Sequence, residues 1–361
     1  MKRVLRNYVL RSLFASWAGI AAILLAVLML SQVPAALGRA VTREIAPQVV
    51  WQFVGWMSIA NVSAILPIST LLAIVLTLGR LSSDSELTAM RASGVSLADL
   101  LVPIGLLVLP IVAVQAWFAW QLAPEALCSA AKARSQAART LALSPIRGGE
   151  FQRFGDGATY FVESVDPDGT LRNVFIKRGT TRAVEVVLAR QGRLEYLPEG
   201  DLLRLHLTEG RRYEGVPGTA RFRLLTFAEY VASVPLPKNV TTCPRSDARP
   251  TLDLARSDTA EDRAELNWRL GLPLMPLVLG LIALPLSITR PREGRYARVP
   301  AAIAIFFVYI FGSIGLTGFS ARDPALGPMA YWSLHGAVAL AALAAFQWRQ
   351  NGRLLPRWAH G

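Results

Sequence analysis

The sequence contains few of the residues on which catalytic and nucleotide-binding sites depend. Its 361 residues include only three histidines, two cysteines and four lysines. The histidines, His206, His335 and His360, form no HExxH-type spacing and have no paired cysteines near them, so no metal site is predicted. No lysine follows a glycine, which excludes the GxxxxGK[ST] phosphate loop of ATPases. We therefore expect no catalytic residue, cofactor or metal in this chain.

Acidic and basic residues are also missing from six long apolar stretches. The chain is 53% apolar, and each stretch of about 20 residues is long enough to cross a bilayer as a helix. The stretches are residues 12–33, 51–79, 100–122, 270–289, 299–320 and 329–348. Without charges at membrane depth, a proton- or ion-coupled carrier is disfavoured, and the lone His335 is interpreted as a packing or interfacial residue. Pro273, Pro276 and Pro285 predict local breaks in the fourth stretch.

Lysine and arginine are unevenly distributed over the short segments that join these stretches. The two termini, the segment between the second and third stretches and the segment between the fourth and fifth carry thirteen lysine and arginine residues. The other short segments contain only Arg39, Arg43 and Arg322. Those thirteen are Lys2, Arg3, Arg6, Arg11, Arg80, Arg91, Arg290, Arg292, Arg295, Arg298, Arg349, Arg353 and Arg357. By the positive-inside rule, both termini and the segment between the second and third stretches are cytoplasmic, and the polar middle of the chain is external.

The net charge of +13 follows from this topology rather than from a nucleic-acid-binding face. Residues 122–266 carry 21 basic and 19 acidic residues, a balance of +2, which leaves +11 on the membrane segments and their short loops. A basic stripe on one folded domain, the usual sign of nucleic-acid binding, is therefore not indicated. We expect no nucleic acid among the partners.

Short alternating runs separated by turn signals fill the external part. ATYFVESV, TLRNVFIKR and LLRLHLTEGRRYEG are typical, with GDG, DPDG and PEGD between runs. Alternation without helical patterns indicates an antiparallel sheet in a small sandwich, roll or partly open barrel. Cys128 and Cys243 also lie in the external part, where one disulfide is allowed but not required.

These patterns predict an α-helical membrane protein with six transmembrane helices, three on each side of an inserted all-β domain. Residues 1–122 hold the first three helices and a short cytoplasmic helix at about residues 83–94. Residues 123–266 hold the external domain and its linker, and residues 267–361 hold the last three helices and a cytoplasmic tail.

The segment LTLGRLSSDSELTAMRASGVSLADLL, residues 76–101, is a polar island between the second and third stretches. Its SDSE sequence matches a capping box, with Ser83 as the N-cap and Glu86 reaching back to it. Gly94 is well placed to end the helix. These signals locate the short cytoplasmic helix.

One face of this helix is predicted to be a contact surface. Leu87, Met90 and Arg91 share that face by their spacing, and Glu86 lies beside Met90, so the apolar surface is rimmed by opposite charges. Two interpretations remain open. The surface docks into a groove of a partner, or Glu86 is only a cap and Leu87 and Met90 rest on the bilayer surface.

Four motifs lie near the ends of the predicted spans. They are LPISTLLAIVLTLGRL at residues 66–81, SDSELTAMRASGV at 83–95, RAELNWRL at 263–270 and LPLSITRPREGR at 284–295. Together with the arrangement of three spans, β domain and three spans, they make the chain resemble the LptF/LptG permease family. That family forms the membrane subunits of the lipopolysaccharide-export ABC transporter of Gram-negative bacteria. The AELNWR and PREGR sequences favour the LptF branch.

The resemblance implies a subunit of a larger inner-membrane complex. Its partners would be an LptG-like permease in a heterodimer, a dimer of an LptB-like ATPase that binds ATP and Mg, an LptC-like single-span protein and an LptA-like periplasmic bridge. In the family the island is a coupling helix in a groove of the ATPase, and Glu86 occupies the position of the acidic residue that pairs with an arginine there. The external domain would be a periplasmic β-jellyroll that carries lipopolysaccharide onward for outer-membrane biogenesis.

The phosphates of lipopolysaccharide need cations near the external membrane surface. Topology makes Arg39, Arg43 and Arg322 the candidates, and ordinary interfacial snorkelling is the alternative. The sequence has PAAL where members of the family often carry a basic residue in the first external segment. A different function, a scaffold or signalling subunit that recruits an ATPase and senses an envelope partner without contacting lipid, is the alternative to a permease.

Overall fold

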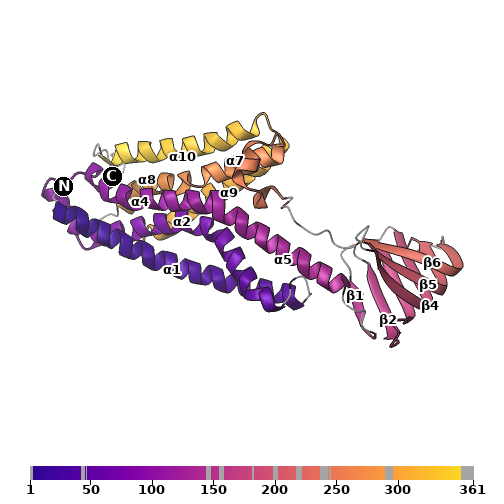
Figure 1. Cartoon of the computed structure of the whole chain (residues 1–361). Helices are drawn as coiled ribbons and strands as arrows, with labels where there is room; N and C mark the ends of the chain where they lie inside the picture. The colour runs from indigo at the N-terminus through magenta and orange to yellow at the C-terminus, as the bar shows by residue number, and fades with distance from the viewer. Residues whose placement is uncertain are drawn as a thin grey trace, which may run out of the picture. The chain divides into compact units, whose positions relative to one another are not determined.

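A computed structural model of the protein describes residues 3–41, 45, 47–143, 148–153, 158–180, 183–197, 202–216, 222–235, 243, 245–288 and 296–350. The chain divides into two units (Figure 1). Residues 1–38, 48–131 and 242–361 form the first, here called the membrane unit, and residues 39–47 and 132–241 form the second, the sheet unit.

The membrane unit is built from helices that run side by side (Figure 1). Their bounds are α1 Arg3–Val41, α2 Val50–Ser83, α3 Glu86–Ala92, α4 Leu101–Trp117, α5 Ala123–Leu143, α6 Thr251–Ala255, α7 Ala260–Gly271, α8 Leu274–Ser287, α9 Val299–Arg322 and α10 Gly327–Gln350. The last residues of α1, from residue 39, and those of α5, from residue 132, belong to the sheet unit. Short 3-10 turns, Pro47–Val49, Ala98–Leu100 and Ser246–Ala248, precede α2, α4 and α6. Among the described residues, five helices are long and apolar enough to cross a membrane, and a sixth span results if α7 and α8 are one broken span. The prediction of a multi-pass helical membrane protein is confirmed.

The core of the membrane unit lies between α2, α4, α8 and α9. Leu71, Ile74 and Leu78 on α2 and Met275 and Leu279 on α8 are completely buried. In contrast, only four residues of α1 are buried among the described ones, Val9, Leu13, Ala21 and Ala36. Among the described candidate spans, the first therefore buries the smallest share of its residues.

The third span continues beyond its apolar stretch. After α4 the helix widens into a π-turn, Phe118–Leu122, and continues without interruption as α5. Residue 122, where the apolar stretch ends, therefore lies inside a continuous helix rather than at a helix end.

The fourth span is broken rather than straight. Helices α7 and α8 meet at an angle of 43° across Leu272 and Pro273. Proline lacks an N–H and its ring crowds the preceding turn, which accounts for the break at Pro273. Pro276 lies in the first turn of α8 and Pro285 lies near its end, and both are accommodated within that helix.

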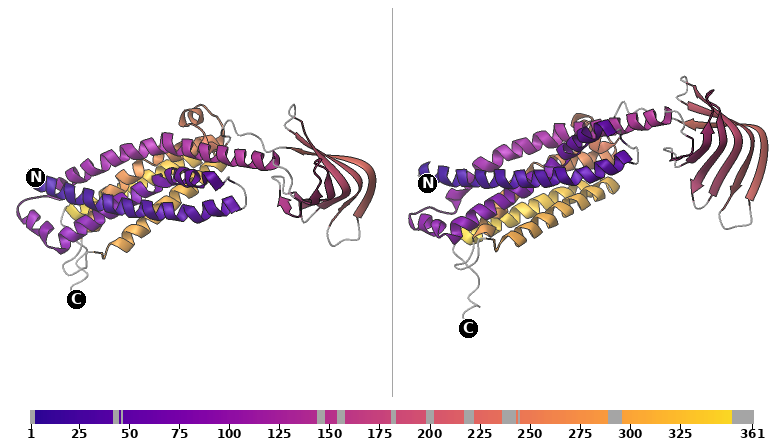
Figure 2. Two further views of the ribbon diagram at one scale, coloured as in Figure 1. Left: turned by 60° about the horizontal axis from the view of Figure 1, so that its bottom comes forward. Right: turned by 90° about the horizontal axis from the view of Figure 1, so that it is seen from below.

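The described residues of the inserted β domain form one antiparallel sheet of six strands. The strands are β1 Phe151–Arg153, β2 Thr159–Val165, β3 Leu171–Thr180, β4 Ala183–Leu197, β5 Leu202–Gly215 and β6 Phe222–Pro235. Strands that are adjacent in sequence are adjacent in the sheet, which is the order of a meander. Figure 2 shows that the sheet is strongly curved. The predicted all-β insertion is confirmed.

The curvature coincides with a change in the side-chain alternation of two strands. Asn173 in β3 and Glu209 in β5 have positive φ values of 46° and 53°. Such a residue shifts the alternation by one, so Leu171 and Val174, three residues apart, are both buried on the same face. The result is a continuous apolar face, formed by Ala158, Tyr160, Val162, Leu171, Val174, Ile176, Val187, Ala189, Leu205, Leu207 and Ala232.

Candidate functional site

The short helix predicted between the second and third spans is present as α3, but it begins differently from the prediction. Helix α2 continues to Ser83, and Ser85, with a positive φ of 60°, precedes the first residue of α3, Glu86. No side chain caps the N-terminus, so the predicted capping box of Ser83 and Glu86 is wrong. Ser83 is still helical and Ser85 is left-handed, so neither adopts the extended backbone of the N-cap in a capping box.

The end of α3 matches the prediction for Gly94. Gly94 has a φ of 89°, its N–H donates to the Arg91 carbonyl at 3.0 Å, and the Val95 N–H donates to the Met90 carbonyl at 3.1 Å. These two bonds form a Schellman motif, in which glycine is favoured because it adopts the left-handed conformation without strain. A left-handed residue therefore lies just beyond each end of α3, and these two turns define where the helix begins and ends.

The apolar side chains of α3 point into the protein. Leu87 and Met90 are 5% and 7% exposed and belong to the same hydrophobic cluster as α2 and α4. They neither rest on a bilayer surface nor form an exposed contact surface in this chain. The exposed residues of α3 are Thr88, Ala89, Arg91 and Ala92. Consequently, a displacement of α3 must also displace the core residues against which Leu87 and Met90 pack.

Glu86 links α3 to two membrane helices. The Tyr8 hydroxyl of α1 donates to Glu86 Oε2 at 2.8 Å, and Arg80 Nη1 of α2 lies 3.6 Å from Glu86 Oε1. Asp84 Oδ2 lies 3.8 Å from the same guanidinium nitrogen. Glu86 remains one-third exposed, so another cation has access to its carboxylate. Sequence reasoning identified Glu86 but missed Tyr8, because no sequence pattern links two residues that are 78 positions apart.

The arginines proposed for phosphate binding fall in different units: Arg39 belongs to the sheet unit and Arg322 to the membrane unit. Arg39 and Arg322 lie in the last turns of α1 and α9, where a cation also interacts favourably with the helix dipole. Arg322 is exposed and Arg39 is half-buried. Arg43 lies outside the described residues. The assignment of these three arginines to phosphate binding stays a prediction.

A buried arginine of α7, which sequence reasoning did not single out, binds the segment of residues 246–251 that follows the sheet. Arg269 is 2% exposed, and its five N–H donors are matched by five acceptors at 2.8–3.0 Å. The acceptors are the Glu265 carboxylate, the Thr251 hydroxyl and the carbonyls of Ser246, Asp247 and Arg249. The available signal was an arginine directly before an apolar stretch, four residues after a glutamate, within RAELNWRL.

Two further links complete this joint. Trp120 Nε1 donates to the Arg269 carbonyl at 3.0 Å, and the Thr251 hydroxyl donates to the Trp120 carbonyl at 2.7 Å. Cys128 of α5 forms a disulfide with Cys243, which answers the question that the sequence left open. The covalent bond and the hydrogen bonds hold the two chain segments that lead to and from the sheet.

The break between α7 and α8 is packed against two aromatic side chains of α10. A Cβ added to Gly271 would lie 2.1 Å from Tyr331 Oη and 2.7 Å from His335 Nε2. The other ring nitrogen of His335 lies 2.5 Å from the hydroxyl of Tyr309 on α9. Only glycine fits this close approach. His335 of α10 is buried and packs between α9 and the break.

Comparisons with known proteins agree with this architecture. Residues 7–348 match the profile of the family described as lipopolysaccharide export system permease LptF/LptG. The chain is 29% identical over 336 residues to the lipopolysaccharide export system permease protein LptF of Escherichia coli K12, covering 90% of each chain. LptF of Shigella flexneri has the same identity and coverage. The family resemblance inferred from the motifs is confirmed: the chain belongs to the LptF/LptG family of lipopolysaccharide export system permeases.

Proposed function

We propose that this chain is the permease subunit of an ABC transporter that extracts lipopolysaccharide from the inner membrane and passes it to a periplasmic bridge. It catalyses no reaction itself. ATP and Mg bind to a dimer of an LptB-like ATPase on the cytoplasmic side, and an LptG-like permease completes the lipid cavity. The observation that carries the proposal is the set of contacts around Glu86, which join α3 to both α1 and α2.

These contacts suggest how motion enters the membrane. A partner that binds the exposed face of α3 and pairs with Glu86 acts on a helix whose Leu87 and Met90 are packed in the core. Tyr8 adds a connection to α1, the least buried span. Movement of the ATPase is thereby transmitted to the first and second spans together.

The exposed apolar faces of α1 and α9 are suited to line the lipid cavity. On α9, Phe307 and Phe311 stack with ring centroids 5.7 Å apart, and Val308 is 76% exposed. Such an apolar surface fits the acyl chains of lipopolysaccharide, and Arg39, Arg43 and Arg322 are proposed to contact its phosphates. The apolar face of the curved sheet would continue this path in the periplasm, toward LptC-like and LptA-like partners.

The first test is a charge reversal at Glu86. We expect Glu86→Arg to abolish co-purification with the ATPase and ATP-driven release of lipopolysaccharide from proteoliposomes. The new arginine would face the arginine of the ATPase groove with which Glu86 is proposed to pair. An arginine-to-glutamate change in the ATPase groove should restore both. Asp84→Arg, two residues away, is the control and should retain assembly. Unchanged assembly and release in Glu86→Arg would refute the coupling role.

A second test separates a permease from a scaffold that contacts no lipid. A photo-crosslinking residue at Val308 on α9 should capture lipopolysaccharide in cells, whereas one at Leu340, an exposed residue of α10, should capture much less. Equal or absent capture at both positions would favour the scaffold. This outcome is independent of the Glu86 test.

A further inference from the structure

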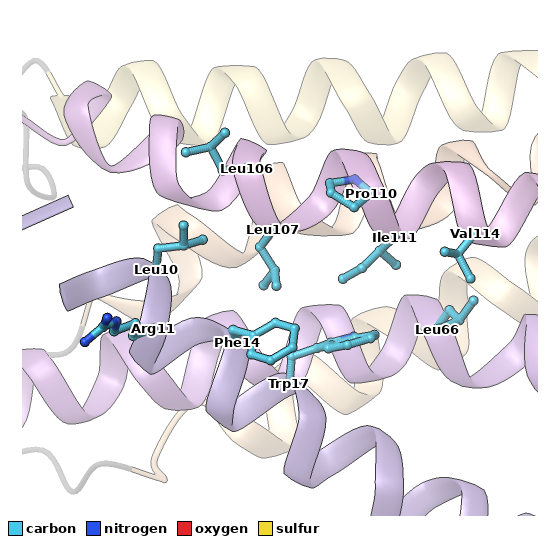
Figure 3. Close-up of a pocket in the computed structure, with 10 residues that line it drawn as sticks. All are labelled: Leu10, Arg11, Phe14, Trp17, Leu66, Leu106, Leu107, Pro110, Ile111 and Val114. Atoms are coloured by element: carbon cyan, nitrogen blue, oxygen red, sulfur yellow. The ribbon is translucent and has the colours of Figure 1, made fainter. Parts of the chain in front are cut away.

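An apolar groove lies between α1 and α4 (Figure 3). Leu10, Phe14 and Trp17 project into it from α1 at helical spacing, and Leu106, Pro110 and Val114 project from α4. Leu66, Leu107 and Ile111 form the rest of the apolar lining. Figure 3 shows the Arg11 guanidinium at one end of this groove, with the apolar side chains beyond it. The groove therefore has a charged end and a long apolar interior.

This chain leaves the groove open. Phe14, Leu106 and Val114 are 56%, 47% and 42% exposed. The cavity measures about 570 Å³, within the usual range for a ligand site. Of the described residues that line it, Arg11 alone is charged and none is acidic. An occupant should therefore be apolar along its length and anionic at one end.

The size of the cavity favours a lipid chain over a helix of another protein. The groove follows α1 from Leu10 to Trp17, about 10 Å of helix at 1.5 Å per residue. A partner helix 10–12 Å across would fill roughly 800 Å³ or more over that length, which exceeds the cavity. An extended acyl chain is much thinner and matches a narrow, open apolar groove.

We propose that this groove binds one acyl chain of an anionic glycerophospholipid, with its headgroup phosphate at Arg11. Guanidinium groups pair strongly with phosphate, and Arg11 is the charged residue at the end of the groove. This lipid is distinct from the proposed cargo. Arg11 and Arg39 are separated by about 42 Å along α1, so the groove opens at the opposite end from the proposed lipopolysaccharide contacts.

The test measures lipid binding directly and does not depend on transport. The complete complex, purified in detergent and stripped of lipid, is titrated with phosphatidylglycerol and followed by native mass spectrometry. Arg11→Gln removes the phosphate contact, and Leu106→Trp or Val114→Trp fills the groove. We expect Arg11→Gln to raise the midpoint of the tightest lipid adduct about tenfold, the effect of losing one charge-assisted contact. Each tryptophan substitution should raise it by a similar factor, because the larger side chain occupies the space of the acyl chain.

Matched controls distinguish the groove from general membrane effects. Arg3→Gln removes a charge from the same end of α1, and Leu109→Trp enlarges an exposed residue of α4 outside the groove. Both should leave the midpoint unchanged. Equal midpoints in all variants would overturn the proposal. Loss of a protein subunit from Leu106→Trp and Val114→Trp, with lipid binding intact, would show instead that the groove is a protein contact.

Discussion

The hydroxyl of Tyr8 donates a hydrogen bond of 2.8 Å to Oε2 of Glu86, 78 residues further along the chain. This bond joins the beginning of the first span to α3. One carboxylate thus serves two helices at once, while one-third of its side chain stays accessible. Glu86 is therefore both an internal link and a group available to a partner.

Removing the Tyr8 hydroxyl should weaken coupling without preventing assembly. In Tyr8→Phe the ring stays and one hydrogen bond of about 1 kcal/mol is lost, so lipopolysaccharide release per ATP hydrolysed should fall about fivefold. The measurement compares both rates in the same proteoliposomes. If the two residues act through this bond, adding Tyr8→Phe to Glu86→Ala, which removes the acceptor, should cause little further loss. Additive losses would contradict the link.

The disulfide should stabilise the joint that leads to the sheet. Cys128 and Cys243 are separated by 115 residues, and closing a loop of that size is worth about 4 to 5 kcal/mol in a chain-entropy treatment. Cys128→Ser, Cys243→Ser and the double variant should lower the apparent melting temperature equally. The chain has two cysteines, so maleimide labelling of the unreduced, denatured protein should detect no thiol. Two labelled thiols would show that the bond does not form.

Arg269 should be among the least replaceable residues of the membrane unit. Arg269→Leu leaves several buried acceptors and the Glu265 carboxylate without a donor, and we expect a loss of about 3 to 5 kcal/mol of stability. Arg269→Lys should recover only part of it, because an ammonium supplies three donors. Thermal unfolding in detergent measures both. Arg263→Leu is the control: its ion pair with Asp258 is exposed, and its loss should cost less than about 1 kcal/mol.

The packing at Gly271 can be tested by a rescue. Gly271→Ala places a methyl group against the Tyr331 hydroxyl, so it should lower the apparent melting temperature by several degrees. Tyr331→Phe removes the nearest atom and should restore part of the loss. Gly336→Ala on α10 is the control, since a Cβ there meets no atom within 4 Å and alanine favours a helix. Equal destabilisation by both glycine substitutions would contradict the close approach.

Much of the architecture follows from the sequence because membrane insertion depends on local composition. The local pattern of residues predicts each element: uninterrupted apolar stretches predict spans, and alternating patterns predict strands. Gly94 predicted the end of α3 because a left-handed residue is needed there. The beginning of α3 was mispredicted because Ser83 and Glu86 match a local capping motif, whereas in the structure α2 includes Ser83 and the left-handed Ser85 precedes α3. The partner roles of Arg39, Arg43 and Arg322 stay predictions.

The sequence by itself determined the six apolar stretches, the inserted all-β domain and the family, since these depend on composition and on the order of motifs along the chain. Tertiary structure alone decided which groups meet. It placed Tyr8 on Glu86, surrounded Arg269 with carbonyls and turned Leu87 and Met90 inward. It also shifted the alternation at Asn173 and Glu209, so that one face of a curved sheet became continuously apolar. These contacts join residues that are distant in sequence, and no local pattern encodes such pairs.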